Sequence, residues 1–242
     1  MLDLSGVDAH NPAMNPAITG ISSMATKALL AELTRAYVQR SGHQVEIESV
    51  GGVDAAKRVQ SGEAFDVVVL ATDAIDKLLA AGRIVAGSKV DLVHSGVAIA
   101  VRAGAPRPEI GSEDALRRAV LAARTIGYST GPSGVQLARL FERWGIAADI
   151  QDRIVTAPPG VPVGALVARG EVELGFQQLA ELMHLEGIEV LGPLPEAVQI
   201  VTTFSAGVCA ASGHPDAGRE LLDFMASPAA ADAKRRQGME PA

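Results

Sequence analysis

Hydrophobic and polar positions along this chain follow two periods that replace each other repeatedly. Short apolar or alternating runs indicate β-strands, and longer stretches with apolar residues three and four positions apart indicate amphipathic helices. The clearest strand is the apolar run 66–70 (DVVVL), which is typical of a buried parallel strand. The clearest helix lies within 129–145 and has one apolar face, formed by Leu137, Leu140, Phe141 and Trp144.

The same reading predicts the other elements. Further strands are expected at 17–22, 43–50, 92–102, 125–128, 152–156, 172–178, 188–191 and 197–211. Further helices are expected to end near 40, 61, 82 and 124, with N-terminal caps at Ser22 or Ser23, Asp54, Thr72 or Asp73, and Ser112. Helices are also expected at 162–169, 214–226 and 228–237. Strands that alternate with helices predict an α/β protein with mostly parallel sheets.

Two segments suggest how the domains are organised. The Gly/Pro-rich connector 103–111 and the long apolar stretch 197–211 indicate two crossings between lobes. We expect a flexible N-terminal extension at 1–13, a first lobe made of 14–100 and 203–242, and an inserted second lobe at 101–202. Such an arrangement places a ligand cleft between the lobes, at the carboxyl ends of the strands.

Four turns rich in small residues precede predicted helices and could line that cleft. Backbone N–H groups at a helix N-terminus lack intrahelical partners, and the helix dipole adds positive charge there, so such turns can hold an anion. An ordinary capped turn is the alternative reading of each one. The candidate residues are Ser22, Ser23, Gly51, Gly52, Ser133 and Gly160.

Composition excludes several other classes of function. A formal net charge of −7 and an aromatic content of 3% do not favour nucleic-acid binding. No apolar run reaches the roughly 18 residues of a membrane span, so we expect no membrane insertion. The single cysteine, Cys209, excludes an internal disulfide and a multi-cysteine zinc site, and no glycine-rich turn ends in GK[ST]. We therefore expect no cofactor and no metal.

The order of four motifs carries a resemblance to a known family. GISSMATKALLAEL, AAKRVQSGEAFDVVVLATDAIDKLL, STGPSGVQLARLFERWG and GALVARGEVELGFQQ resemble segments of the type II periplasmic solute-binding proteins, in their molybdate-binding, ModA-like branch. The resemblance covers about residues 17–242. It implies a two-lobed fold, a small anionic ligand and, if the chain is exported, an ABC transporter as partner. The ligand contacts that it implies fall on Ser22 or Ser23, Gly51 or Gly52, Ser133, Pro159 or Gly160, and Gln177 or Gln178.

The chain departs from the molybdate-binding pattern at two of these positions. The second turn lacks a hydroxyl, and Gln177 or Gln178 stands where the family carries a late tyrosine. Amide side chains donate and accept hydrogen bonds, which suits a carboxylate better than a bare oxyanion. We expect one of the two glutamines to contact the ligand.

The segment GFQQLAEL is also similar to the aconitate isomerases, enzymes of the same branch. This resemblance implies an alternative function, a cofactor-independent isomerase that shifts a C=C bond in a polycarboxylate. Such a reaction needs a base that removes a proton from the carbon next to a carboxylate, and donors that stabilise the enolate-like charge. The candidate bases are Lys27, His94, Glu181 and His184.

The N-terminus has neither the basic nor the apolar region of a secretory signal. We therefore expect a cytoplasmic protein as the sequence is written, and a periplasmic one if a leader has been removed.

Overall fold

The structure is a computed structural model, and it describes residues 17–242. The extension predicted at 1–13 lies outside the described residues. The strands are β1 (Ile18–Ser23), β2 (Val45–Val50), β3 (Val67–Ala71), β4 (Val90–Arg102), β5 (Ile126–Ser129), β6 (Ile154–Ala157), β7 (Leu174–Gln178), β8 (Ile188–Pro193), β9 (Val201–Val208) and β10 (Met239–Pro241). The α-helices are α1 (Lys27–Ser41), α2 (Gly52–Gln60), α3 (Thr72–Ala80), α4 (Glu113–Ala122), α5 (Pro132–Arg143), α6 (Ala147–Ile150), α7 (Val163–Ala168), α8 (Leu179–Leu182), α9 (Pro215–Ala226) and α10 (Ala231–Arg236).

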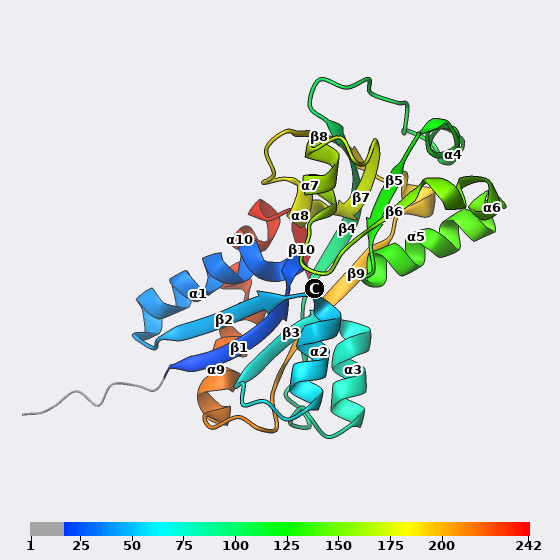
Figure 1. The fold of residues 1–242 in the computed structure, drawn as a ribbon. Helices are drawn as coiled ribbons and strands as arrows, with labels where there is room; N and C mark the ends of the chain where they lie inside the picture. Colours follow the sequence, from blue (N-terminus) through cyan, green and yellow to red (C-terminus); the bar gives the residue numbers. More distant parts are fainter. Residues whose placement is uncertain (1–16) are drawn as a thin grey trace, which may run out of the picture.

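The strands form a sheet that runs through two lobes, as the sequence predicted (Figure 1). Its order is β2-β1-β3-β9-β4-β7-β5-β6, and β8 and β10 also pair with β4. The outer strands of both lobes pair in parallel, because each is followed by a helix that returns the chain to the same edge. The two strands that cross between the lobes, β4 and β9, are antiparallel to each other.

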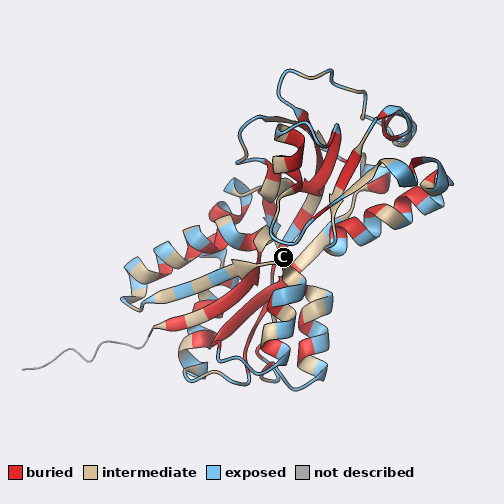
Figure 2. Cartoon of the chain, viewed as in Figure 1, coloured by how far each residue is buried: buried red, intermediate tan, exposed pale blue. Residues whose placement is uncertain are grey.

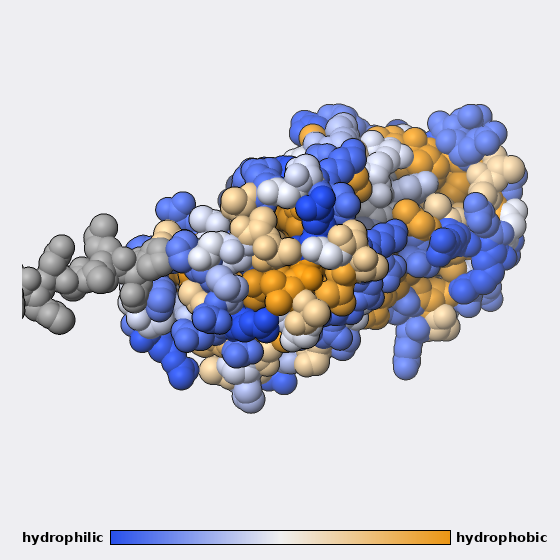
Figure 3. Space-filling model, turned by 90° about the horizontal axis from the view of Figure 1, so that it is seen from below, coloured by the Kyte–Doolittle hydropathy of each residue, from blue (hydrophilic) through white to orange (hydrophobic). Residues whose placement is uncertain are grey.

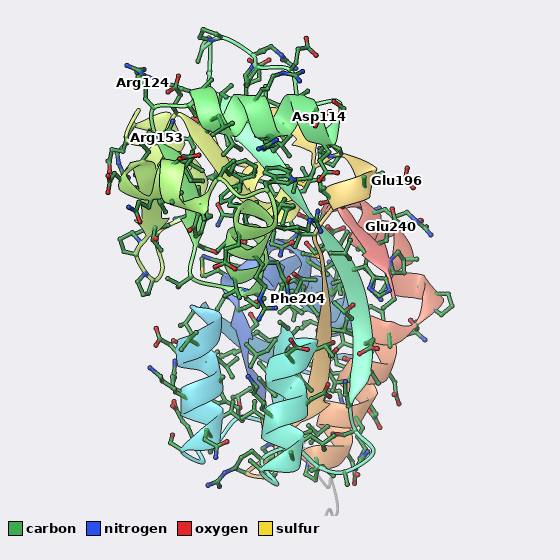
Figure 4. The ribbon with its side chains drawn as sticks, turned by 90° about the vertical axis from the view of Figure 1, so that its right-hand side faces the viewer. Asp114, Arg124, Arg153, Glu196, Phe204 and Glu240 are labelled. Atoms are coloured by element: carbon green, nitrogen blue, oxygen red, sulfur yellow. The ribbon has the colours of Figure 1, made fainter. Side chains whose placement is uncertain are left out.

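The register of β4 shows how the lobes face each other. The last residue of β3, Ala71, lies opposite Phe204 of β9, and Phe204 lies opposite Val93 of β4. The last residue of β7, Gln178, lies opposite Val97. Val93 and Val97 are four residues apart, or about 13 Å along a strand. The carboxyl ends of the parallel strands in both lobes therefore converge on this short part of β4, where Figure 4 places Phe204 between the lobes.

Separate apolar cores hold the two lobes (Figure 2). In the first lobe, helices α1 and α9 cover one face of the sheet with residues such as Leu33 and Leu221, while α2 and α3 cover the other. In the second lobe, α4 and α5 bury Leu116, Leu137 and Phe141 against β4 and β7. We propose that the division into 14–100 with 203–242, and 101–202, describes these two lobes, with the crossing in β4 a few residues earlier, because Val97 and Ile99 belong to the second core.

Three of the predicted helix caps are wrong. Helix α1 begins at Lys27, after a 3-10 turn, η1 (Met24–Thr26), and neither Ser22 nor Ser23 caps it with its side chain. Helix α2 begins two residues before Asp54, and α3 begins at Thr72 itself. The N-cap residues are Thr26, Gly51 and Ala71, and none of these three helices has a side-chain cap. Ser112 does cap α4, and its Oγ accepts the Ala115 N–H at 3.1 Å.

Other differences concern short or terminal elements. The stretch predicted as one strand at 197–211 holds a 3-10 turn, η3 (Glu196–Val198), before β9. The helix predicted at 228–237 is divided into a 3-10 turn (Pro228–Ala230) and α10. The four-residue helices α6 and α8, and β10, were not predicted.

The outer surface shows apolar side chains in separate groups among hydrophilic ones on the face seen in Figure 3. Within residues 17–242, no helix combines the length and the apolar character needed to cross a bilayer. Cys209 is buried, and burial together with the nearby Asp66 charge raises the pKa of its thiol to about 12. This thiol is structural, as its apolar sequence context indicated.

Asp66, directly before β3, is a buried carboxylate that links two segments of the first lobe, β1 and the residues before α9. Asp66 Oδ2 accepts the Thr19 N–H at 2.8 Å, and its Oδ1 accepts the Ser212 hydroxyl at 2.7 Å and the His214 N–H at 3.1 Å. Burial alone would raise the pKa of Asp66, but these hydrogen bonds outweigh it and hold the pKa below the ordinary value of 3.8. The ionised carboxylate therefore ties β1 to the segment before α9.

We expect Asp66→Ala to lower the free energy of unfolding by about 3 kcal/mol, because it leaves buried donors without an acceptor. Because the folded-state pKa is depressed, this contribution is present above pH about 4 and is lost as the pH falls through the folded-state pKa. Urea unfolding at pH 7 and near pH 3 would measure both effects. Asp76→Asn is the matched control, since Asp76 is an exposed partner of Lys89, and it should change stability by less than about 0.5 kcal/mol. Equal effects of the two substitutions would contradict this role of Asp66.

Candidate functional site

The first two predicted turns lie side by side in the first lobe. A Cβ placed on Gly52 would be 3.6 Å from the Ser23 Cβ, so the end of β1 contacts the first residue of α2. Gly51 is the N-cap of α2, and no side chain caps this helix. The first N–H groups of α2 therefore have no partner within the helix and lie beside Ser23.

The hydroxyls of the two first-turn serines differ in their partners. Ser22 is fully buried, and its Oγ lies 2.8 Å from Ser49 Oγ and donates to the Ser23 carbonyl at 3.1 Å. Ser23 is also buried, yet its Oγ has no hydrogen-bond partner within residues 17–242. A buried polar group without a partner costs free energy unless a ligand satisfies it. Ser22 thus acts structurally, with Ser49 as a partner that sequence reasoning missed, while Ser23 is available to a ligand.

The third turn brings Ser133 to the N-terminus of α5. Gly131 is the N-cap, Pro132 is the first helical residue, and Ser133 is the buried second one. The helix packs closely on the preceding strand here, because a Cβ on Gly134 would lie only 1.8 Å from the Ser129 carbonyl oxygen. The glycine therefore allows the backbone N–H groups of the first turn to be presented at the end of β5.

The fourth turn is the neighbour of the third. Ser129 of β5 lies opposite Ala157 of β6, so the turns that follow these strands are adjacent. Gly160 has a φ of +78° and is exposed in the turn closed by the Val161 N–H to Pro158 carbonyl bond. A left-handed φ at this position explains the need for glycine.

The two glutamines point to opposite faces of β7, since they are successive residues of a strand. Gln178 uses both ends of its amide: its Oε1 accepts the Ser95 hydroxyl at 2.7 Å, and its Nε2 donates to Thr202 Oγ1 at 3.1 Å. Gln178 therefore ties β7 to both crossing strands. Gln177 Oε1 accepts the Gly164 N–H at 3.3 Å, at the start of α7, and its side chain also hydrogen-bonds Glu181.

Glu181 is the one candidate base of the four that is not exposed. It is half-buried in α8, which directly follows β7 and contacts η1 of the first lobe. Burial raises the pKa of Glu181 to about 7, although the hydrogen bond from Gln177 acts in the opposite direction. The other candidates, Lys27, His94 and His184, are exposed, and the two histidines bond to Thr203 and Gln237.

The hollows of the surface do not coincide with these residues. One hollow of about 200 Å³ is lined by residues that include Glu63, Arg83 and Cys209, and another of about 400 Å³ includes Thr19 and Glu48. Both lie on the first lobe, and neither includes a predicted site residue. The unpartnered donors lie elsewhere, at Ser23 and the start of α2. In residues 17–242, no group of three or more His, Cys, Asp or Glu side chains could hold a metal ion.

Comparison with known proteins places this geometry in a family. Residues 18–240 match the family described as bacterial extracellular solute-binding protein. The chain therefore belongs to that family, and the resemblance to type II periplasmic solute-binding proteins is confirmed.

One curated relative is much more similar than the solved structures. The chain is 38% identical over 230 residues to an aconitate isomerase from a Pseudomonas species, covering 93% of this chain and 87% of the relative. Among solved structures, it resembles the periplasmic molybdate-binding protein of Azotobacter vinelandii, with a TM-score of 0.77 at 19% identity, covering 92% and 98% of the two chains. It also resembles the sulfate-binding protein SubI of Mycobacterium tuberculosis, with a TM-score of 0.76 at 18% identity and coverages of 94% and 87%. These structural similarities show the two-lobed fold.

We expect Gly134→Ala to lower the free energy of unfolding by about 2 kcal/mol or more, because the new methyl group collides with the Ser129 carbonyl. The matched control is Gly131→Ala, whose Cβ would lie 3.4 Å from Ser129 Oγ and which should cost less than about 1 kcal/mol. Thermal unfolding of both variants would measure the difference. Equal stabilities would show that α5 does not approach β5 as closely as described.

Proposed function

We propose that this protein binds a small polycarboxylate at the junction of its lobes and moves the C=C double bond of that ligand, as an aconitate isomerase does. The main support for ligand binding is that the Ser23 hydroxyl is buried without a partner and lies beside the free N–H groups of α2. Both are hydrogen-bond donors, and a carboxylate is the complementary acceptor. Ser133 and Gly160 would add donors from the second lobe.

Sequence similarity supports the isomerase over a binding protein for molybdate or sulfate. The isomerase relative is 38% identical over most of both chains, while the two oxyanion-binding proteins are below 20%. This reverses the order in which the sequence alone ranked the two functions. The side chains also support it, because Gln177 or Gln178 stands at the late tyrosine position of the molybdate pattern. Of the two, Gln177 lies between the start of α7 and Glu181. We propose that Gln177, rather than Gln178, is the glutamine nearest the ligand.

A binding protein without catalysis is the second candidate, and membership in the solute-binding family favours it. Such a protein would deliver its anion to an ABC transporter and would close its lobes around the ligand. Both candidates use the same donors. They differ only in whether the bound ligand is chemically changed.

We expect trans-aconitate added to the purified protein to convert to cis-aconitate, with a change in ultraviolet absorbance that a heat-denatured sample does not produce. Thermal shifts with molybdate, sulfate, citrate and both aconitate isomers would be measured in parallel. Stabilisation by the aconitates without conversion would support the binding protein and rule out the isomerase. Stabilisation by molybdate alone would rule out both polycarboxylate functions.

We expect Ser23→Ala to weaken ligand binding by about 10-fold or more while leaving the ligand-free protein as stable as the wild type. The reason is that the substitution removes a donor to a charged ligand but also removes an unpaired buried hydroxyl. Titration calorimetry and thermal unfolding would measure the two effects. Ser49→Ala is the control with the opposite pattern: it loses the bond to Ser22, so stability should fall by about 1 kcal/mol with affinity retained. Unchanged affinity in Ser23→Ala would remove Ser23 from the site.

A further inference from the structure

The direction of the Glu181 side chain follows from its three neighbours in α8. Leu179 faces the turn before β10, because a Cβ on Gly238 would lie 3.1 Å from Leu179 Cδ2. Ala180 joins the core of the first lobe, which includes α1. Leu182 packs in the second lobe and reaches within 3.1 Å of a Cβ built on Gly164, in α7. Each side of α8 therefore contacts a different part of the protein.

Successive residues of a helix are about 100° apart, so Glu181 lies between the directions of Ala180 and Leu182 and opposite Leu179. It therefore points into the angle between η1 of the first lobe and the start of α7 in the second. Figure 1 shows α8 in this position, with α7 on one side and α1 and α10 on the other. The segment η1 follows Ser23, and α7 follows the turn that contains Gly160. The carboxylate thus faces the space between two of the predicted ligand-binding turns.

The surroundings of Glu181 provide no charge to neutralise it. Among residues 17–242, no Lys, Arg or His forms an ion pair with this side chain, whereas Glu32, Glu63 and Glu113 each have an arginine partner. Its hydrogen-bond partner is the Gln177 amide, which the Gly164 N–H holds in place. A desolvated carboxylate with a neutral, fixed partner can exist in either protonation state, whereas a purely structural carboxylate is normally paired.

We propose that Glu181 is the residue that carries the proton in the isomerisation, and that Gln177 positions it. This assignment rests on the proposed isomerase function. It identifies the substrate class as an unsaturated polycarboxylate with a methylene group next to both a carboxylate and the double bond.

In the proposed reaction, the Glu181 carboxylate removes a proton from the methylene carbon of the substrate. The electron pair of that C–H bond becomes the new C=C bond, and the pair of the former double bond accepts a proton at its far carbon from the Glu181 carboxylic acid. The substrate keeps its composition, nothing is oxidised or reduced, and the carboxylate is regenerated. Negative charge that spreads into the adjacent substrate carboxylate is stabilised by the N–H and hydroxyl donors of the turns.

The acidity of Glu181 agrees with this role. A group that must both take and return a proton works best when its pKa is close to the working pH. Burial raises the pKa of Glu181 to about 7.

The test measures isomerisation and binding together in the full-length protein. Glu181→Gln keeps the size and hydrogen bonding of the side chain but cannot carry a proton. We expect kcat to fall by about 100-fold or more, while the Kd for trans-aconitate, measured by titration calorimetry, is unchanged or lower because a negative charge facing an anion is removed. Glu181→Asp keeps a carboxylate but moves it back by one methylene group. It should lose less activity than Glu181→Gln, which would show that the carboxylate itself is needed. Glu186→Gln, at an exposed carboxylate five residues along, is the matched control and should keep wild-type kcat.

The possible outcomes separate this assignment from the proposed function. If the wild type isomerises trans-aconitate and Glu181→Gln keeps more than a tenth of its kcat, Glu181 is not the proton carrier. If kcat and affinity fall together by the same factor, Glu181 is a binding residue, which also overturns the assignment. If the wild type binds trans-aconitate but does not convert it, the isomerase function itself fails.

Discussion

The hydrogen bonds of Gln178 to Ser95 and Thr202 join three strands at the point where the lobes meet. Ser95 and Thr202 are opposite each other on β4 and β9, the strands that run through both lobes, and Gln178 ends β7. All three residues are buried or half-buried, so this polar contact lies at the centre of the molecule. The contact therefore links β7 of the second lobe to both crossing strands, close to the strand ends that carry the predicted turns.

The crossing strands also decide which part of the chain is able to bend. Before Gly96, β4 pairs with β9 and β10 in the first lobe, and from Val97 it pairs with β7 and β8. A movement that brings the lobes together must therefore deform the chain near Gly96 and the matching start of β9 at Val201. Gln178 spans this position with its two hydrogen bonds, one to each crossing strand.

Much of the fold could be predicted from the sequence because its signals are local. Alternating and continuous apolar runs identified the strands, and the face formed by Leu137, Leu140 and Phe141 is buried as predicted. The turns that contain Ser23 and Gly52 were expected to line one cleft, and these two residues lie side by side. The partners of Ser22, and the engagement of both ends of the Gln178 amide, could not be predicted, because Ser49, Ser95 and Thr202 are distant in sequence and are brought close only by register.

Glu181, the proposed proton carrier, shows the same limit. Helix α8 has four residues, too few for a helical period to be recognised, and its burial comes from packing against η1 more than 150 residues earlier in the chain. A carboxylate in the first turn of a helix normally stays ionised, because the helix dipole favours negative charge there. In Glu181 the effect of burial is larger than that of the helix dipole, and the pKa is raised to about 7.

A site built only from N–H and hydroxyl donors can hold an anion without changing it, and a carboxylate facing that anion would weaken binding by repulsion. Such a group is compatible with the site because burial raises its pKa to about 7, so that it exchanges a proton easily. If Glu181 has the role proposed for it, a single residue separates a protein that binds a polycarboxylate from one that isomerises it.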